Sequence, residues 1–257
     1  MKILAIILLA QAAASAPIPG ANAVLNRPDL RYIVVGESHG TKQMPAIFGD
    51  LVDAAAGRGP VVTVMEHSGA DQPLLDAYLA SDGGPADRAA LLAGVSWSKG
   101  MRDGRSSVAM LDLIERLRLL RRQGADLVVL ACQPFKLDQM SDYEGAMGQC
   151  WRDAGSAHPK ARVLVLAGNA HTDRAPSDGR TRAIAQLPAG ETLSLVASSA
   201  GGQAWNCQNA KCGPFALYPG DARARGVYLT PQDGHFDGVL SAGGAYAASP
   251  PAVLEQP

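Results

Sequence analysis

The chain has 257 residues, of which 47% are hydrophobic and 18% are charged, and its formal net charge is −1. This composition excludes a disordered chain and predicts one large globular domain. It also argues against a nucleic-acid partner, because no cationic run or stripe stands out that would neutralise phosphates.

The first residues have the features of a secretory signal peptide. Lys2 is followed by the apolar run ILAIILLA and then by small residues. The run is too short to span a membrane, and the ASA sequence ending at Ala16 predicts a signal peptide over 1–16. A second small-residue site would move the cut to the position after Ala23. We therefore expect a periplasmic or secreted protein with a single domain over 24–257 and no transmembrane segment after cleavage.

Short apolar runs rich in β-branched residues follow one another along the rest of the chain. They predict five strands, at 31–36, 60–66, 125–132, 161–168 and 191–198. Helical patterns alternate with them, one starting near Met44 and stopping at Gly57, and one over 106–123 with Ser106 or Ser107 as its cap. Continuous apolar strands are typical of a mainly parallel sheet covered on both faces, so we expect a three-layer α/β/α fold. Two further short strands are expected at 226–229 and 237–241.

Four cysteines are expected to be oxidised after export. Three pairings are available to them. We favour Cys207 with Cys212, which flank the short polar segment QNAK, and therefore Cys132 with Cys150. A four-cysteine zinc site is the alternative, but the spacings contain no C-x-x-C.

Titratable side chains follow three of the predicted strands. The first strand leads into Glu37 and His39, the second into Glu66 and His67, and the fourth into His171. Because ligands bind beyond the carboxyl ends of parallel strands, we expect these groups to share one site. Their convergence favours a functional site over isolated structural histidines.

Two kinds of chemistry fit these residue types. In general acid–base hydrolysis, His39 or His171 would activate water while a glutamate orients the imidazole. In a metal site, His39, Glu66 and His171 would bind a divalent ion that keeps a water in an open position. Residue types alone do not distinguish the two.

Ser38 offers a third interpretation, since GESHG fits the G-x-S-x-G nucleophile elbow. An elbow of that type follows a central strand and needs a downstream acid and an oxyanion hole. Here the motif follows the first predicted strand, no HGGG-type segment precedes it and no acid is assigned. We therefore expect Ser38 not to be the nucleophile.

Other polar and aromatic residues have weaker functional interpretations. Arg102 and Arg105 would either meet an anionic group or a site carboxylate, or lie in a solvated loop. Trp97 is expected in the core. His235 and Asp237 are expected on a surface turn.

The motifs VVGESHGT, VMEHS and LAGNAHT resemble those of the erythromycin esterase/ChaN-like superfamily, which includes Tiki/TraB-type proteins with paired G-x-x-H motifs. The resemblance carries over Glu37, His39, Glu66 and His171, and His67 matches no motif position. It implies an α/β/α core and metal-independent hydrolysis with a histidine base for esterase-like members. It implies a divalent-metal peptidase for Tiki-like members and haem binding at a dimer interface for ChaN-like members. The chain is shorter than typical erythromycin esterases, so macrolide specificity does not carry over.

The favoured interpretation is an exported hydrolase that cleaves an ester or amide bond of a small-molecule or peptide substrate and requires no cofactor. His39 would be the general base, Glu37 and Glu66 would orient it or the water, and His171 would be the acid or the oxyanion stabiliser. The alternatives are a ChaN-like protein that binds haem or a metal without catalysis, and a metal-dependent peptidase.

Overall fold

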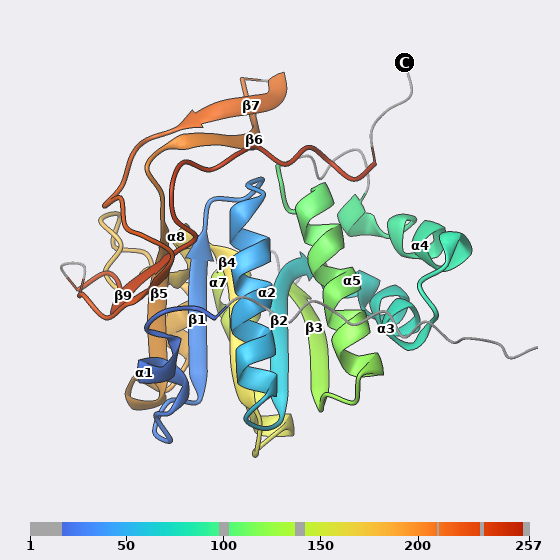
Figure 1. Cartoon of the computed structure of the whole chain (residues 1–257), viewed down its shortest axis with the longest axis horizontal. Coiled ribbons are helices and arrows are strands. Elements are labelled where there is room, and N and C mark those ends of the chain that lie inside the picture. The colour runs from blue at the N-terminus through green and yellow to red at the C-terminus, as the bar shows by residue number, and fades with distance from the viewer. Residues whose placement is uncertain (1–16, 98–102, 137–141, 210, 232–233, 254–257) are drawn as a thin grey trace, which may run out of the picture.

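The computed structural model describes residues 17–97, 103–136, 142–209, 211–231 and 234–253 (Figure 1). The expected signal peptide over 1–16 and Arg102 lie outside the described residues. Within the described part of the chain, no helix is both long and apolar enough to cross a membrane.

A seven-stranded sheet forms the centre of the molecule, in the order β3-β2-β4-β1-β5-β9-β8. Its strands are β1 (Tyr32–Glu37), β2 (Val61–Ser68), β3 (Leu127–Gln133), β4 (Arg162–Gly168), β5 (Thr192–Ser198), β8 (Gly226–Tyr228) and β9 (Gly238–Ser241). All neighbouring strands are parallel except β8, which runs antiparallel to β9. The five predicted main strands and the two short ones are confirmed, each within a few residues of its predicted bounds.

Alternate residues of β1 belong to two different cores, which explains its uninterrupted apolar sequence. Ile33 and Val35 pack into one buried cluster, and Tyr32 and Val34 pack into the other. Because successive side chains of a strand point to opposite faces, a strand covered on both faces must be apolar at every position.

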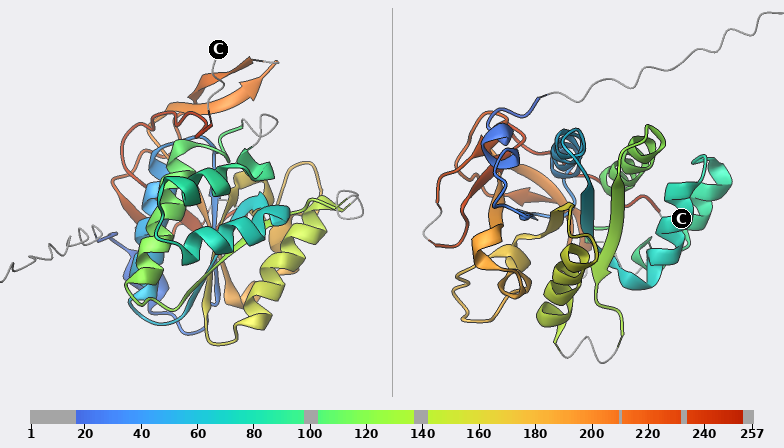
Figure 2. Two further views of the ribbon diagram at one scale, coloured as in Figure 1. Left: turned by 90° about the vertical axis from the view of Figure 1, so that its right-hand side faces the viewer. Right: turned by 90° about the horizontal axis from the view of Figure 1, so that it is seen from below.

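Helices cover both faces of the sheet, so the three-layer α/β/α prediction is confirmed. One cluster is completed by α2 (Gln43–Ala56) and α5 (Val108–Arg122), and the other by α7 (Tyr143–Ala157). Figure 2 shows α2 and α5 together on one side of the sheet and α7 on the other. Within the described residues, the other α-helices are α1 (Ala21–Leu25), α3 (Gln72–Ala80), α4 (Pro85–Leu92) and α8 (Asn169–Thr172).

The two predicted helix boundaries follow the expected capping chemistry. The backbone N–H of Met110 donates to the side chain of Ser107, so Ser107 is the N-cap of α5 and not Ser106. Gly57 is the C-cap of α2, as predicted.

A hairpin of β6 (Gly202–Gln208) and β7 (Lys211–Leu217) extends beyond the main sheet. Cys207 pairs with Cys212 across the two strands, and the two form a disulfide. The second disulfide joins Cys132 of β3 to Cys150 of α7. Both predicted pairings are confirmed, although the hairpin strands themselves were not predicted.

Candidate active site

The strand order brings the three predicted motifs together. β4 lies between β1 and β2, so their carboxyl ends are neighbours. Glu37, the last residue of β1, is in register with Gly168, the last residue of β4. The side chains of Glu37, His39, Glu66 and His171 therefore meet at one edge of the sheet, as the sequence predicts.

Glu66 is the centre of this cluster and is 4% exposed. Its Oε2 accepts a hydrogen bond from the Gly168 backbone N–H at 2.8 Å and lies 3.3 Å from Nε2 of His39. Its Oε1 lies 3.0 Å from Nη1 of Arg105 and 3.5 Å from Nε2 of His171. Burial alone would raise the pKa of Glu66, but the charge of His39 and the hydrogen bond of His171 hold it well below its usual value.

His39 lies between two carboxylates. Its Nδ1 is 3.0 Å from Oε1 of Glu37, and its Nε2 faces Glu66. Burial alone would lower the pKa of His39, but the charge of Glu66 and the hydrogen bonds of both glutamates raise it to about 10. Glu37 is buried, which raises its own pKa, and its Oε2 has no hydrogen-bond partner among the described residues.

His171 forms a second histidine–glutamate pair. Its Nδ1 lies 3.0 Å from Oε1 of Glu144, in the first turn of α7. The backbone N–H of Ala183 donates to Oε2 of Glu144 at 2.9 Å, which fixes the carboxylate. Burial would lower the pKa of His171, but the hydrogen bonds of Glu144 and Glu66 raise it to about 9. Sequence reasoning missed Glu144, since nothing in its local pattern connects it to His171.

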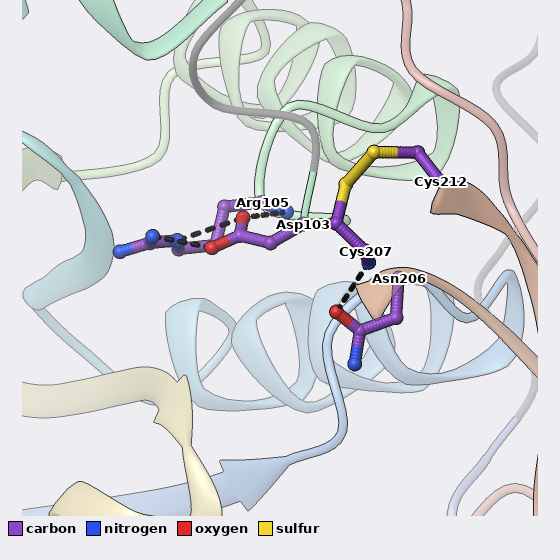
Figure 3. The surroundings of a disulfide bond; sticks show 5 residues. All are labelled: Asp103, Arg105, Asn206, Cys207 and Cys212. Atoms are coloured by element: carbon purple, nitrogen blue, oxygen red, sulfur yellow. Dashed lines mark hydrogen bonds and ion pairs between the residues drawn. A yellow bond between two sulfur atoms is a disulfide. The ribbon is translucent and has the colours of Figure 1, made fainter. Parts of the chain in front are cut away.

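Arg105 contributes a permanent positive charge to the cluster. Besides Glu66, it binds Asp103, with its Nε 3.0 Å from Oδ1. The pairing with a site carboxylate is therefore the correct interpretation of Arg105, and the solvated loop is wrong. Figure 3 shows this pair together with the Cys207–Cys212 disulfide of the hairpin.

Gly40, which follows His39, is in contact with both the β6–β7 hairpin and the loop that carries Arg105. Its carbonyl oxygen accepts a hydrogen bond from the Trp205 N–H at 2.9 Å, which ties the hairpin to the His39 turn. A Cβ on Gly104 would lie 2.3 Å from the backbone nitrogen of Gly40, so the loop that carries Arg105 packs closely on the same turn. Both contacts hold the backbone beside His39 in place.

The described contacts of His67 are with Trp97 and with the backbone of Arg105, and none is with His39 or His171. His67 is buried, its ring lies edge-on to that of Trp97 with centroids 5.1 Å apart, and burial lowers its pKa to about 4. It also forms a hydrogen bond with the backbone of Arg105. Trp97 is 3% exposed and is a core residue, as expected.

Ser38 is not among the described hydrogen-bond partners of Glu37, His39, Glu66 or His171. It lines a small cavity with Ser198, Leu217 and Tyr246. No histidine lies within hydrogen-bond distance of its hydroxyl among the described contacts. The geometry therefore gives no support to Ser38 as an elbow nucleophile.

His235 and Asp237 lie in the segment before β9, outside the Glu66 cluster. His235 contacts Asp173 at 2.9 Å, while Asp237 accepts hydrogen bonds from Arg174 and from the backbone N–H of Ser194. These contacts brace the edge of the sheet, so the surface-turn prediction agrees with the structure.

The donor set does not fit a divalent metal. Within the described residues, no group of three or more His, Cys, Asp and Glu side chains is arranged to hold a metal ion. The guanidinium of Arg105 already binds Glu66, and its fixed charge repels a second cation at the same carboxylate.

The same cluster does not fit a haem iron. Each histidine has its Nε2 turned to Glu66, and because the pKa values of both imidazoles are raised, an iron would have to displace a proton from either ring near neutral pH. Tyr143, whose ring is 5.7 Å from that of His171, is the aromatic candidate for an axial ligand. Burial and the charge of Glu66 raise its pKa to about 12, which opposes the phenolate form.

Comparisons with known proteins identify the fold and no closer relationship. No protein-family model matches the chain, and neither does the sequence of any curated protein. A variant of the erythromycin esterase EreC in its open conformation is similar with a TM-score of 0.65 and 10% identity, over 91% of this chain and 94% of that one. A succinoglycan biosynthesis protein is similar with a TM-score of 0.64 and 8% identity, over 89% and 91%. The type III effector HopBA1 is similar with a TM-score of 0.52 and 18% identity, over 90% and 98%. The chain therefore has an erythromycin-esterase-like fold.

Proposed function

We propose that the protein is a hydrolase that cleaves an ester or amide bond by general acid–base catalysis with His39 and His171. The observation that carries this proposal is the meeting of both Nε2 atoms at one buried carboxylate, Glu66. Two imidazoles that face the same carboxylate can serve one substrate, the first accepting a proton and the second donating one. The esterase among the structural neighbours supports the proposal at the level of the fold.

His39 is the proton acceptor in this proposal. Glu37 binds its Nδ1, which fixes the ring and leaves Nε2 as the reactive nitrogen. Glu66 stabilises the imidazolium that forms when His39 takes a proton from water. The water then attacks the carbonyl carbon of the substrate, and the carbonyl oxygen becomes negatively charged.

His171 is the proton donor and stabilises that oxygen. Glu144 orients it through Nδ1, in the same way that Glu37 orients His39. Its pKa of about 9 keeps it protonated at neutral pH, as an acid must be. Proton transfer from His171 to the leaving group then completes the cleavage.

The raised pKa of His39 has a consequence for the base step. With a value of about 10, His39 is almost entirely protonated at neutral pH and must lose that proton before it accepts one from water. We therefore expect the rate to increase with pH well into the alkaline range.

A panel of p-nitrophenyl esters and chromogenic peptide amides, assayed with the protein lacking residues 1–16, tests the proposal. His39→Ala and His171→Ala should each reduce kcat/KM by at least about 100-fold, the usual size of a general acid–base contribution. Ser38→Ala should retain most activity. His158→Ala is the matched control, because His158 lies just before β4, at the end of the sheet away from the cluster.

Two results would contradict this mechanism. Loss of activity in Ser38→Ala with an intact fold would identify the serine as the nucleophile. Activity that a chelator abolishes and an added divalent ion restores would require a metal, contrary to the donor geometry. Absence of turnover with every ester and amide tested would leave the hydrolase proposal without support.

A further inference from the structure

A large cavity lies at the amino ends of the strands, at the opposite end of the sheet from the candidate active site. Its volume is about 730 Å³. It is formed by the segments that precede β1, β2, β4 and β5. The seven residues of β4 separate it from Gly168 and the Glu66 cluster by roughly 20 Å, at about 3.3 Å per residue.

The cavity is lined by more positive than negative side chains. The cationic ones are Arg31, Arg58, Lys160 and Arg162, and the carboxylates are Asp29 and Glu191. These six side chains leave a net formal charge of +2. Asp29 is also bound by Arg27, which lies outside the lining, with Nε 3.2 Å from its Oδ1. Asp29 is therefore shared with a cation that does not face the cavity.

Arg58 and Arg162 hydrogen-bond only neutral oxygens. Arg162 donates to the carbonyl oxygens of Leu25 at 2.6 Å and Arg27 at 3.0 Å. These bonds use two of its five N–H groups. Neither arginine forms an ion pair with a carboxylate within the part of the chain that the structure describes.

Arg58 holds the same segment of chain. It donates to the side-chain oxygens of Asn22 and Asn26 and to the carbonyl oxygen of Ala54. Arg58 and Arg162 therefore hold the α1 region from two sides and lie close to one another. Burial and the positive charge of Arg58 lower the pKa of Arg162, and the charge of Asp29 offsets this only in part, so repulsion between the two guanidiniums outweighs the attraction of Asp29.

Arg31 also lines the cavity, and its guanidinium donates to the carbonyl oxygen of Gly155, which is another neutral acceptor.

We propose that this cavity binds a small organic phosphate, with its oxyanion between Arg58 and Arg162. Arginine N–H groups match phosphate oxygens in geometry, and an anion between the two guanidiniums replaces their repulsion with attraction. A phosphate monoester carries close to two negative charges at pH 7, which matches the charge of the lining. The apolar side chains of Leu25, Leu30 and Ala55 in the same lining suit the organic part of the ligand.

Titration of the labelled protein with phenyl phosphate, followed by NMR at constant ionic strength set with chloride, tests this inference. We expect saturable shifts of the backbone amides in 26–31, 58–59 and 160–162, and weaker binding of inorganic phosphate, which lacks the ring. Arg58→Gln and Arg162→Gln should each weaken phenyl phosphate binding at least 10-fold. Arg121→Gln is the control, because Arg121 is exposed at the end of α5.

The inference is overturned if the shifts do not saturate, if they spread evenly over the surface arginines, or if Arg121→Gln weakens binding as much as the cavity variants. Equal affinity for phenyl phosphate and inorganic phosphate would contradict the inference that the cavity binds the organic part of the ligand. Because Arg162 also anchors α1, Arg162→Gln is judged only if its spectrum remains folded. If Arg162→Gln does not remain folded, two other results test the inference. One is the map of shifts on the unmodified protein, and the other is the affinity of Lys160→Gln, which should be weakened less.

Discussion

Nδ1 of His171 lies 3.0 Å from Oε1 of Glu144, and this contact joins α8 to the first turn of α7. The Glu37–His39 pair has the same separation. The two pairs therefore have the same arrangement. In each, a glutamate binds Nδ1 of the imidazole, and Nε2 of the imidazole faces Glu66. Four of the five members were predicted from motifs, and Glu144 is the one that only the fold reveals.

Glu144→Gln should preserve the fold while it weakens the proton donor. Loss of the negative charge should lower the pKa of His171 below about 9, because Glu144 is among the groups that raise it. We expect kcat to fall on the order of 10-fold, less than for removal of His171 itself. NMR titration of the His171 ring measures the pKa directly. Asp153→Asn, on an exposed part of the same helix, is the control, and an unchanged His171 pKa in Glu144→Gln would contradict the pairing.

The pH dependence of hydrolysis should change when Glu66 loses its charge. In the unmodified protein, kcat/KM should increase with pH up to about 9 and then level off, because His171 begins to lose the proton that it donates before His39, with a pKa of about 10, is fully deprotonated. Glu66→Gln removes the charge that stabilises both imidazolium ions, so the rising limb should move to lower pH. The maximal rate should fall as well, since the carboxylate also stabilises the protonated base. A rising limb that stays in place would show that His39 is not the group that limits the rate.

Stability should also depend on pH in the alkaline range. The pKa values of His39 and His171 in the folded protein are about 10 and about 9, above the value of about 6.5 for an unfolded histidine. Their contribution is fully present below pH 6.5 and is lost as the pH rises toward 10. The free energy of unfolding, measured with denaturant from pH 6 to pH 10, should therefore decrease. His39→Gln with His171→Gln should flatten this slope, and an equally steep slope in the double variant would assign it to other groups.

Gly168→Ala should reduce activity by obstructing the site. A Cβ on Gly168 would lie 2.9 Å from Nε2 of His39 and 3.5 Å from Oε2 of Glu66. One imidazole must therefore move, and we expect a loss of activity on the order of 10-fold or more, because small misplacements of reacting groups are costly. Gly190→Ala is the control, since a Cβ there would have nothing within 4 Å. Full activity of Gly168→Ala would mean that the position of His39 is not critical.

The sequence predicted the sheet well because its signals are local. Each main strand is a short apolar run, and the rule that parallel strands end at one edge was enough to bring Glu37, Glu66 and His171 together. Glu144 was missed because its contact spans 27 residues and depends on how α7 packs against the sheet. The β6–β7 hairpin was missed because its residues are mostly exposed and lack an apolar pattern.

The position of the signal-peptide cut remains a prediction, and the buried N-terminal residues allow a test of it. Ile18 and Ala21 are 8% and 4% exposed and belong to the core. A chain that starts at residue 24 loses both, and the loss of Ile18 alone should cost about 2 kcal/mol. A chain that starts at residue 17 should therefore unfold at a clearly higher temperature. Equal melting temperatures for the two chains would favour cleavage after Ala23.

The Cys132–Cys150 disulfide makes the position of Glu144 in the cluster depend on whether these two thiols are oxidised. It joins the edge strand β3 to α7, the helix that begins with Tyr143 and Glu144. The helix therefore has a covalent tie to the sheet only where thiols are oxidised. A chain in which this bond is reduced has to hold Glu144 against His171 by packing alone. If the proposed hydrolase activity is correct, we expect its rate to be higher with the disulfide formed than after the disulfide has been reduced.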